Sequence, residues 1–441
     1  MVTPSKFNRT TAHLGEHAGA FADACFQAVE DLFEGAWLRK DKGHRLQTLW
    51  ARRDILATNE LYALGKAIRN LQPKHAKWLE STARRLKKNP ADSHGLITEI
   101  LVCGSTRGHG GAEVYPSKKD EPGVDLVVRF PSSFKYVMSV KNHDISIHEK
   151  AFQKLAEGLK EAFVSKLKKL GENGKLYVVC DDYMSADEFT MCIDFVRGSL
   201  RDDGAYVLIP NRLTVFYAKL VNEPDREFAK TMTSSAVLIH CGEHPNEQLN
   251  FKDKLRKAAE NMQKHVARSD TCFRLLRMRV HASADIIALE KAAQDMLDAN
   301  TDCGLDGVLL TQSTGAREKA TNNTIIYTVV RFAGRTDHAG LVASVQRGER
   351  LSYEFGVGSI GQTPAETFFS IGNHGPTALP RGRYVYQKTD YYYLMKRDAN
   401  GLYGNLESPA SGVHFHAVAE LNGTEVAIQA ISPASEDVLI V

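Results

Sequence analysis

Two strand-like segments joined by a short connection constrain the fold of this chain most. The segment Gly123–Phe130 is largely apolar around Asp125, and Tyr136–Lys141 follows it after a Pro-Ser-Ser break at 131–133. So short a connection between two runs of β-forming residues predicts an antiparallel hairpin. A carboxylate on the first strand and the amine of Lys141 on the second would then face the same small volume.

The lysine in this hairpin needs electrostatic compensation. Ser139 and Lys141 are two residues apart, so they share one face of their strand. An ammonium group in an apolar strand pair is costly to bury without a partner. A divalent metal held by Asp125, with a phosphate beside Lys141, would supply that compensation. The alternative interpretation is that Asp125 ends a turn and Lys141 extends its amine to solvent at a strand edge.

The elements around the hairpin follow a defined order. A helix that carries Glu99 is expected after Asn89-Pro90, with Asp92 or Ser93 as its N-cap. We expect a strand at 112–116, then the hairpin, then a long amphipathic helix. Further strands at 175–180 and 205–209, separated by a helix, suggest a parallel crossover. These elements predict a mixed α/β sheet flanked by helices.

This order, with Glu99 on a helix, Asp125 on a strand and x-x-Lys ending at Lys141, resembles the core of the PD-(D/E)XK nuclease superfamily over roughly residues 90–220. The resemblance implies a restriction-endonuclease-like fold. Two positions depart from the superfamily pattern. Val124 stands in place of the Pro before the Asp, and Ser139 stands in place of the acid two residues before the Lys.

The resemblance also implies a cofactor and roles for individual residues. Mg²⁺ or Mn²⁺ would be held by Glu99, Asp125 and the backbone carbonyl of Val140. Lys141 would position the attacking water and neutralise developing negative charge. Ser139 would orient a metal-bound water. The candidates to replace the missing acid are Glu113 and Asp144.

The length of 441 residues is too great for one compact core. We expect an N-terminal helical region at 1–90, a nuclease-like domain at 91–222, a second α/β domain at 223–340 and a β-rich C-terminal domain at 341–441. Asn-Gly pairs at 400–401 and 422–423 predict hairpin turns in the last region.

Positive charge is concentrated before the nuclease-like segment. The whole chain carries a formal charge of only +3, but residues 38–89 contain fourteen Lys or Arg against four acids. Arg84, Arg85, Lys87 and Lys88 lie at the end of this stretch. Such a cluster suits contacts with phosphates, and it is equally typical of a solvated helix surface.

Cysteine usage and hydropathy point to the cytoplasm. The seven cysteines are scattered and form no C-x-x-C pair, which disfavours a disulfide framework or a cysteine zinc site. No apolar run approaches membrane-spanning length, and the N-terminus lacks a secretory hydrophobic stretch. We expect a soluble cytoplasmic protein without a membrane partner.

Two function classes follow. The first is a Mg²⁺-dependent endonuclease that hydrolyses phosphodiester bonds in DNA, as a restriction-type or antiviral defence effector. The second is a catalytically inactive nuclease-fold protein that serves as a nucleic-acid-binding or assembly subunit. The retained Asp125, Lys141 and Glu99 favour the enzyme, and Ser139 favours the inactive protein. Either class would act on nucleic acid, with a protein partner or a second copy as a further possibility.

Overall fold

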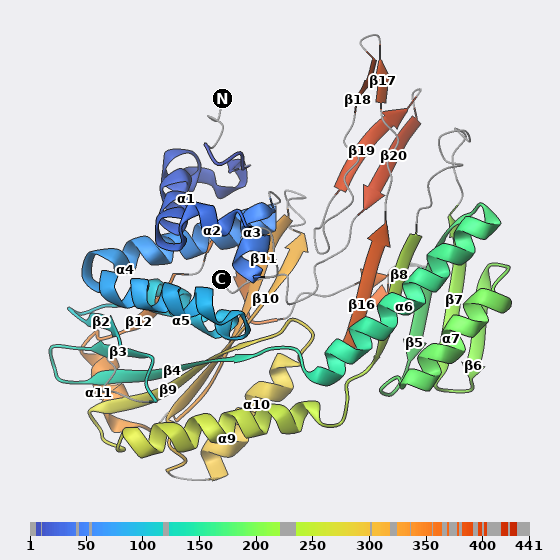
Figure 1. The fold of residues 1–441 in the computed structure, drawn as a ribbon. Helices are drawn as coiled ribbons and strands as arrows, with labels where there is room; N and C mark the ends of the chain where they lie inside the picture. Colours follow the sequence, from blue (N-terminus) through green and yellow to red (C-terminus); the bar gives the residue numbers. More distant parts are fainter. Residues whose placement is uncertain are drawn as a thin grey trace.

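The structure is a computed structural model. Most of it consists of two α/β units, each built around its own sheet (Figure 1). It describes residues 6–9, 11–40, 44–52, 55–117, 123–220, 235–299, 302–317, 324–335, 337–354, 356–363, 368–369, 377–378, 382–390, 396–398, 401–403, 416–421 and 424–429. The predicted α/β class, with a mixed sheet flanked by helices, is confirmed.

The larger sheet has seven strands. Their spatial order is β13 (Ser359–Gly361), β11 (Thr324–Gly334), β10 (Gly307–Arg317), β9 (Cys272–Val280), β4 (Lys135–His143), β3 (Leu126–Arg129) and β2 (Glu113–Pro116). Strand β9 is parallel to both β4 and β10, whereas β3 is antiparallel to both β2 and β4. The sheet is therefore parallel at its centre and antiparallel toward β2.

The predicted hairpin is confirmed as the pair β3–β4. Its register places Leu126 opposite Met138 and Arg129 opposite Lys135. The chain reverses at Ser133, which adopts a positive φ of 71°. Because β3 begins at Leu126, Asp125 lies at the end of the strand pairing, where β3 separates from β4.

Helices cover both faces of the seven-stranded sheet. Figure 1 shows α1 (Ala20–Phe33), α4 (Ile55–Lys88) and α5 (Ser93–Ser105) on one side of the sheet, and α9 (Glu247–His265) and α10 (Ile286–Ala299) on the other. Alternate residues of β4 face the two sides: Met138 and Val140 join the core under α4 and α5, and Val137 joins the core under α9 and α10. This alternation is the period of a strand buried on both faces.

Shorter helices complete the N-terminal region and the edge of this sheet. They are η1 (Ala12–His17), α2 (Gly35–Leu38), α3 (Arg45–Ala51), η2 (Pro90–Asp92) and α11 (Ala339–Gln346). The predicted side-chain cap of α5 is wrong, because neither Asp92 nor Ser93 caps the helix with its side chain; the 3-10 turn η2 leads directly into it.

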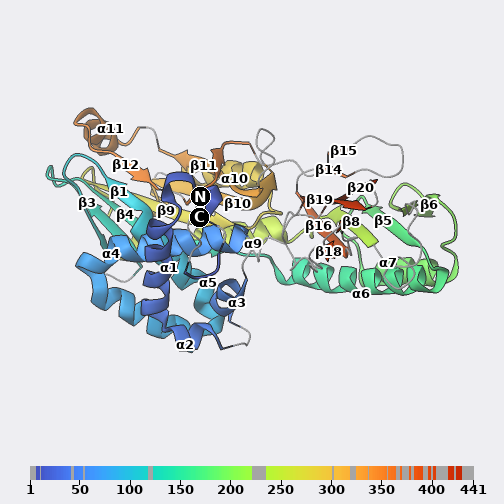
Figure 2. The same ribbon diagram turned by 90° about the horizontal axis from the view of Figure 1, so that it is seen from above.

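The second sheet has five strands and its own helices. The order is β16 (Arg383–Asp390), β8 (Ser235–Gly242), β5 (Asn173–Cys180), β7 (Leu213–Leu220) and β6 (Gly204–Ile209). Helices α6 (Ile147–Leu170) and α7 (Ala186–Gly198) pack on it, as Figure 2 shows from above. The predicted long helix is confirmed as α6, which Ser146 caps at its N-terminus and Gly171 ends with a φ of 65°.

Four two-stranded pairs complete the described structure. They are β1 (Thr106–Gly108) with β12 (Leu351–Tyr353), β14 (Phe368–Phe369) with β15 (Thr377–Ala378), β17 (Lys396–Asp398) with β18 (Gly401–Tyr403), and β19 (His416–Leu421) with β20 (Thr424–Gln429). The last two pairs are antiparallel. β19 and β20 lie on either side of Asn422-Gly423, whereas Gly401 is already the first residue of β18 and pairs with Asp398. Asn400, Asn422 and Gly423 lie outside the described residues.

The prediction that residues 90–220 form one sheet is wrong. The parallel neighbour of β4 is β9, and the strand expected at 175–180, which is β5, lies in the five-stranded sheet. Residues 147–220 and 235–242 lie in the sequence between β4 and α9, and their helices α6 and α7 pack on the five-stranded sheet in a separate apolar core. The predicted second domain is likewise divided, because β8 joins β5 while β9, β10 and β11 complete the larger sheet.

Candidate active site

Residues of the predicted site meet at the point where β3 separates from β4. We call this place, formed by Asp125, Ser139, Val140 and Lys141, the notch. The backbone amide of Asp125 donates to the carbonyl of Met138 at 2.8 Å, which is the last contact before the strands separate. Beyond it, the amide of Val140 donates to Oδ2 of Asp125 at 2.7 Å. The carboxylate of Asp125 thus accepts the hydrogen bond that a neighbouring strand would otherwise accept from Val140. This bond fixes the carboxylate against the backbone of β4.

The amine of Lys141 lies in the same notch. Its Nζ is 3.4 Å from Oδ2 of Asp125 and 3.1 Å from the carbonyl oxygen of Val140. The side chains of Lys141 and Asp125 are 43% and 22% exposed, so the pair is open to solvent on one side. Ser139 is only 1% exposed, and its Oγ donates to Asp125 Oδ2 at 3.3 Å. The sequence prediction that Asp125 and Lys141 lie on neighbouring segments of one hairpin and approach each other is confirmed.

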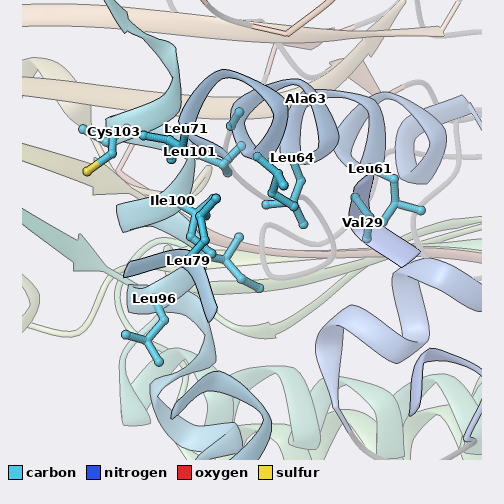
Figure 3. Packing of buried hydrophobic residues seen from close by; sticks show 14 of the residues in the cluster. Val29, Leu61, Ala63, Leu64, Leu71, Leu79, Leu96, Ile100, Leu101 and Cys103 are labelled. Atoms are coloured by element: carbon cyan, nitrogen blue, oxygen red, sulfur yellow. The ribbon is translucent and has the colours of Figure 1, made fainter. Parts of the chain in front are cut away.

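Glu99 approaches the notch from α5. The helix is held against α4 by its apolar side, where Leu96 and Ile100 lie beside Leu79 of α4 (Figure 3). Burial, with a smaller contribution from the negative charge of Asp125, raises the pKa of the Glu99 carboxyl to about 7. The charges of Arg85 and Lys141 act against this shift. Glu99 therefore lies within electrostatic reach of both charged groups of the notch.

The donor set of the notch suits a hard divalent cation. Asp125 Oδ2 and the carbonyl of Val140 both lie within 3.4 Å of one cationic nitrogen, so two hard oxygens converge on a position of positive charge. Glu99 offers a second carboxylate, and burial is the main cause of its raised pKa. In the described part of the chain, no group of three or more His, Cys, Asp or Glu side chains is arranged to hold a metal ion. A cation here would therefore need the Val140 carbonyl as a ligand.

The structure separates the two candidate substitute acids from the notch. Glu113 pairs with Arg129 in the β2–β3 register, at the opposite end of β3 from Asp125. Asp144 lies past Lys141 and is already bound: Arg279 Nη1 donates to its Oδ1 at 2.6 Å, and His94 Nδ1 lies 3.1 Å from the same oxygen. Neither carboxylate is brought beside Asp125.

Sequence reasoning missed the network around Asp144. Arg45 Nη1 lies 2.8 Å from His94 Nε2, which extends the chain of polar contacts from Asp144 through His94. Burial raises the pKa of Asp144, but the hydrogen bond from His94 and the charge of Arg279 outweigh it and hold that pKa well below its usual range. Burial lowers the pKa of His94, although Asp144 opposes this shift.

A second contact ties α5 to β4 beside Lys141. Thr98 Oγ1 lies within hydrogen-bond distance of two acceptors, Asn142 Oδ1 at 3.0 Å and the carbonyl oxygen of His94 at 2.7 Å. Together, the Thr98 and His94 contacts fix the turn of α5 that carries Glu99 against the strand that carries Lys141. The signal in the sequence was a polar pair one helical turn apart, His94 and Thr98, on a helix that is otherwise apolar.

Basic residues of α4 border the notch. Arg85 is exposed, and its charge acts on Glu99, so the end of α4 lies near the carboxylates. Arg84 and Lys88 are also exposed. Lys87 differs, because its Nζ pairs with Glu34 Oε1 at 2.6 Å. The predicted cluster therefore contains three exposed cations and one that is engaged within the protein.

No helix in the described ranges has both the length and the apolar character needed to cross a membrane. Comparison of the chain with family models, with curated proteins and with solved structures finds no match in any of the three.

Proposed function

We propose that this protein is a metal-dependent nuclease of the PD-(D/E)XK type, with a restriction-endonuclease-like core, that hydrolyses phosphodiester bonds in DNA. One observation carries the proposal: Lys141 Nζ lies 3.4 Å from Asp125 Oδ2 in a notch beside a strand end, with Glu99 within electrostatic reach. A charged pair that is partly exposed beside a carboxylate with a perturbed pKa is typical of catalytic sites.

Each residue has a distinct role in the proposal. Asp125, Glu99 and the Val140 carbonyl would hold Mg²⁺ or Mn²⁺, which when bound activates water and stabilises charge on phosphate. Lys141 would neutralise the negative charge that develops on the phosphate oxygens. Ser139 would orient Asp125, to which its hydroxyl donates. The contacts of Thr98 with Asn142 support Glu99 by holding its helix.

The test is a cleavage assay on supercoiled plasmid, linear duplex DNA, single-stranded DNA and RNA, each with Mg²⁺, Mn²⁺ or EDTA. We expect cleavage of DNA with either metal and none with EDTA. Lys135→Ala provides a matched control, because Lys135 lies at the other end of the same strand, opposite Arg129. Cleavage that persists in EDTA, or that Lys135→Ala and Lys141→Ala reduce equally, would contradict the assignment.

The second candidate is a catalytically inactive binding or assembly subunit. The observation in its favour is Ser139, which stands where the superfamily has an acid and is 1% exposed against Asp125. A hydroxyl cannot supply the negative charge of that acid. The inactive alternative predicts salt-dependent binding of nucleic acid without cleavage under any of the metal conditions, and no change in melting temperature on addition of Mg²⁺ or Mn²⁺.

A further inference from the structure

A row of polar side chains on α9 lies beside the notch, on the opposite face of the sheet from α4. The row consists of Lys254, Lys257, Asn261 and Lys264, and we call it the α9 basic stripe. These positions are separated by three, four and three residues, so they follow one line along the helix. All three lysines are exposed.

Two contacts fix the direction in which this stripe faces. At one end, Lys254 Nζ lies 3.5 Å from the carbonyl oxygen of Asn142, the residue after Lys141. At the other end, a Cβ placed on Gly123 would lie 2.9 Å from the side-chain nitrogen of Asn261. Gly123 lies two residues before Asp125. The stripe therefore runs past the notch from the Lys141 side to the Asp125 side.

Lys252 and Arg256 lie toward the other flank of α9. Gln263 donates to the carbonyl of Asp302 at 3.1 Å, and Ala259 lies against Gly304, so this flank faces residues 302–304. Arg256 belongs to the same row as Ala259 and Gln263 by helical spacing. It forms ion pairs with Asp253 at 3.4 Å and Glu260 at 2.7 Å. These two acids lie between the flanks and pair with Arg256, and the flank beside the notch carries Lys254, Lys257 and Lys264.

We propose that the α9 basic stripe binds one phosphate backbone of double-stranded DNA while the exposed cations at the end of α4 bind the other. The inference rests on the proposed function, because it takes the notch as the place where DNA is cut. A duplex has two backbones, and the notch has cations on both faces of the sheet: the α9 basic stripe on one, and the end of α4 with Arg85 on the other.

The chemistry of the stripe favours a duplex over a single strand. Its side chains are amines and an amide, which contact phosphates and do not stack on bases, whereas binding of single strands relies on aromatic platforms. From Lys254 to Lys264 the helix rises about 15 Å. That length corresponds to about four base-pair steps along the axis of a DNA duplex, at about 3.4 Å each.

The experiment measures binding separately from cleavage. Affinity of the full chain for a fluorescent 30-base-pair DNA duplex is titrated with KCl in EDTA, where no metal supports cleavage. Lys257→Glu with Lys264→Glu is compared with Lys252→Glu with Arg256→Glu, which reverses two charges on the far flank of the same helix. Both double variants carry the same net charge, and melting curves verify that both remain folded.

We expect the stripe variant to bind about tenfold or more weakly, with a salt slope smaller by about 2, since each lost phosphate contact removes about 0.9 from that slope. The far-flank variant should stay within about twofold of the parent chain. Equal losses in both variants would overturn the proposal, as would tighter binding of a single strand or of an RNA duplex than of duplex DNA.

Failure of this inference differs from failure of the proposed function. If the parent chain cuts DNA with Mg²⁺ and both double variants cut and bind alike, the nuclease assignment stands and the stripe is rejected. If the stripe variant alone loses duplex binding but the parent chain cuts no substrate with any metal, the stripe stands and the nuclease assignment is rejected.

Discussion

The amine of Lys141 lies 3.4 Å from Oδ2 of Asp125, and the amide of Val140 holds the same oxygen at 2.7 Å. One carboxylate oxygen therefore accepts from a main-chain amide and from the amine of Lys141. Among the described residues, Lys141 is the only charged residue of β4 whose side chain reaches the notch. This arrangement holds the carboxylate at the point where β3 leaves β4. Because the two groups have different roles, removal of the Asp125 carboxylate and removal of the Lys141 amine should have different effects.

We predict that Asp125→Ala abolishes both cleavage and the stabilisation of the protein by Mn²⁺. Lys141→Ala should leave Mn²⁺ stabilisation largely intact and slow cleavage by roughly a hundredfold or more, the scale for loss of one electrostatic stabiliser of a transition state. Single-turnover cleavage rates and melting temperatures with and without Mn²⁺ measure the two effects. A Lys141→Ala variant that cleaves at the parent rate would remove the lysine from the mechanism.

Position 139 tests how the notch compensates negative charge. Ser139→Asp places a second carboxylate 1% exposed beside Asp125, and like charges so close together disfavour ionisation of both. In EDTA the variant should be less stable by on the order of 2 kcal/mol, and Mg²⁺ should restore most of that loss. Cleavage should equal or exceed that of the parent chain.

Ser139→Asn is the control for this substitution, since it adds similar bulk without charge. Urea denaturation in EDTA and in Mg²⁺ gives the free energies of unfolding. If Mg²⁺ raises the stability of the Asp and Asn variants by the same amount, then the notch does not bind the cation through position 139 and Asp125.

The buried His143 gives the protein a dependence on acid. The His143 side chain is 3% exposed. Its ring centroid lies 5.5 Å from that of Phe251 and 5.3 Å from that of His281. Burial lowers its pKa to about 4, with a smaller contribution from the charge of Lys254 and an opposing one from Asp144. Since the folded pKa lies below the unfolded value, the unfolded chain binds the proton first as the pH falls.

The stability that neutral His143 contributes should therefore be present above about pH 6.5 and be lost as the pH falls toward 4, by about 3 kcal/mol in full. We predict that His143→Gln flattens this part of the pH profile of unfolding free energy, whereas His265→Gln at an exposed position of α9 leaves it unchanged. Parallel profiles for the parent chain and His143→Gln between pH 7 and 4 would contradict the prediction.

Local signals predicted the parts of this fold that depend on neighbours in the sequence. The β3–β4 hairpin follows from two apolar runs and a three-residue break, and strand alternation placed Ser139 and Lys141 on one face. The end of α6 at Gly171 follows from the freedom of glycine to adopt positive φ. Each of these features is decided within a few residues of chain.

Long-range features escaped prediction because their signals are distributed. β4 pairs with β9 across the inserted segment 147–242, and β5 lay nearer in sequence with an equally apolar pattern. The ion pair of Asp144 with Arg279 spans 135 residues. The sequence places Asp144 three residues after Lys141 and gives no sign of the distant Arg279, so it cannot distinguish Asp144 from a substitute acid.

The crossing of α1 and α4 offers a test of the packing that supports the site. Helix α4 packs on α5, which carries Glu99, and the last turn of α4 carries Arg85. A Cβ added at Gly65 of α4 would lie 2.1 Å from the carbonyl oxygen of Cys25 in α1, so even an alanine forces the two helices apart. We predict that Gly65→Ala lowers the free energy of unfolding by about 1–3 kcal/mol.

Gly158→Ala in α6 is the matched control, because a Cβ there meets no atom within 4 Å. That change should raise stability by about 0.5–1 kcal/mol, since alanine costs less backbone entropy than glycine in a helix. Urea denaturation followed by circular dichroism compares the two variants with the parent chain. If Gly65→Ala were as stable as Gly158→Ala, then α1 and α4 would not be in backbone contact at this crossing. The packing described for α4, α5 and Glu99 would then be wrong.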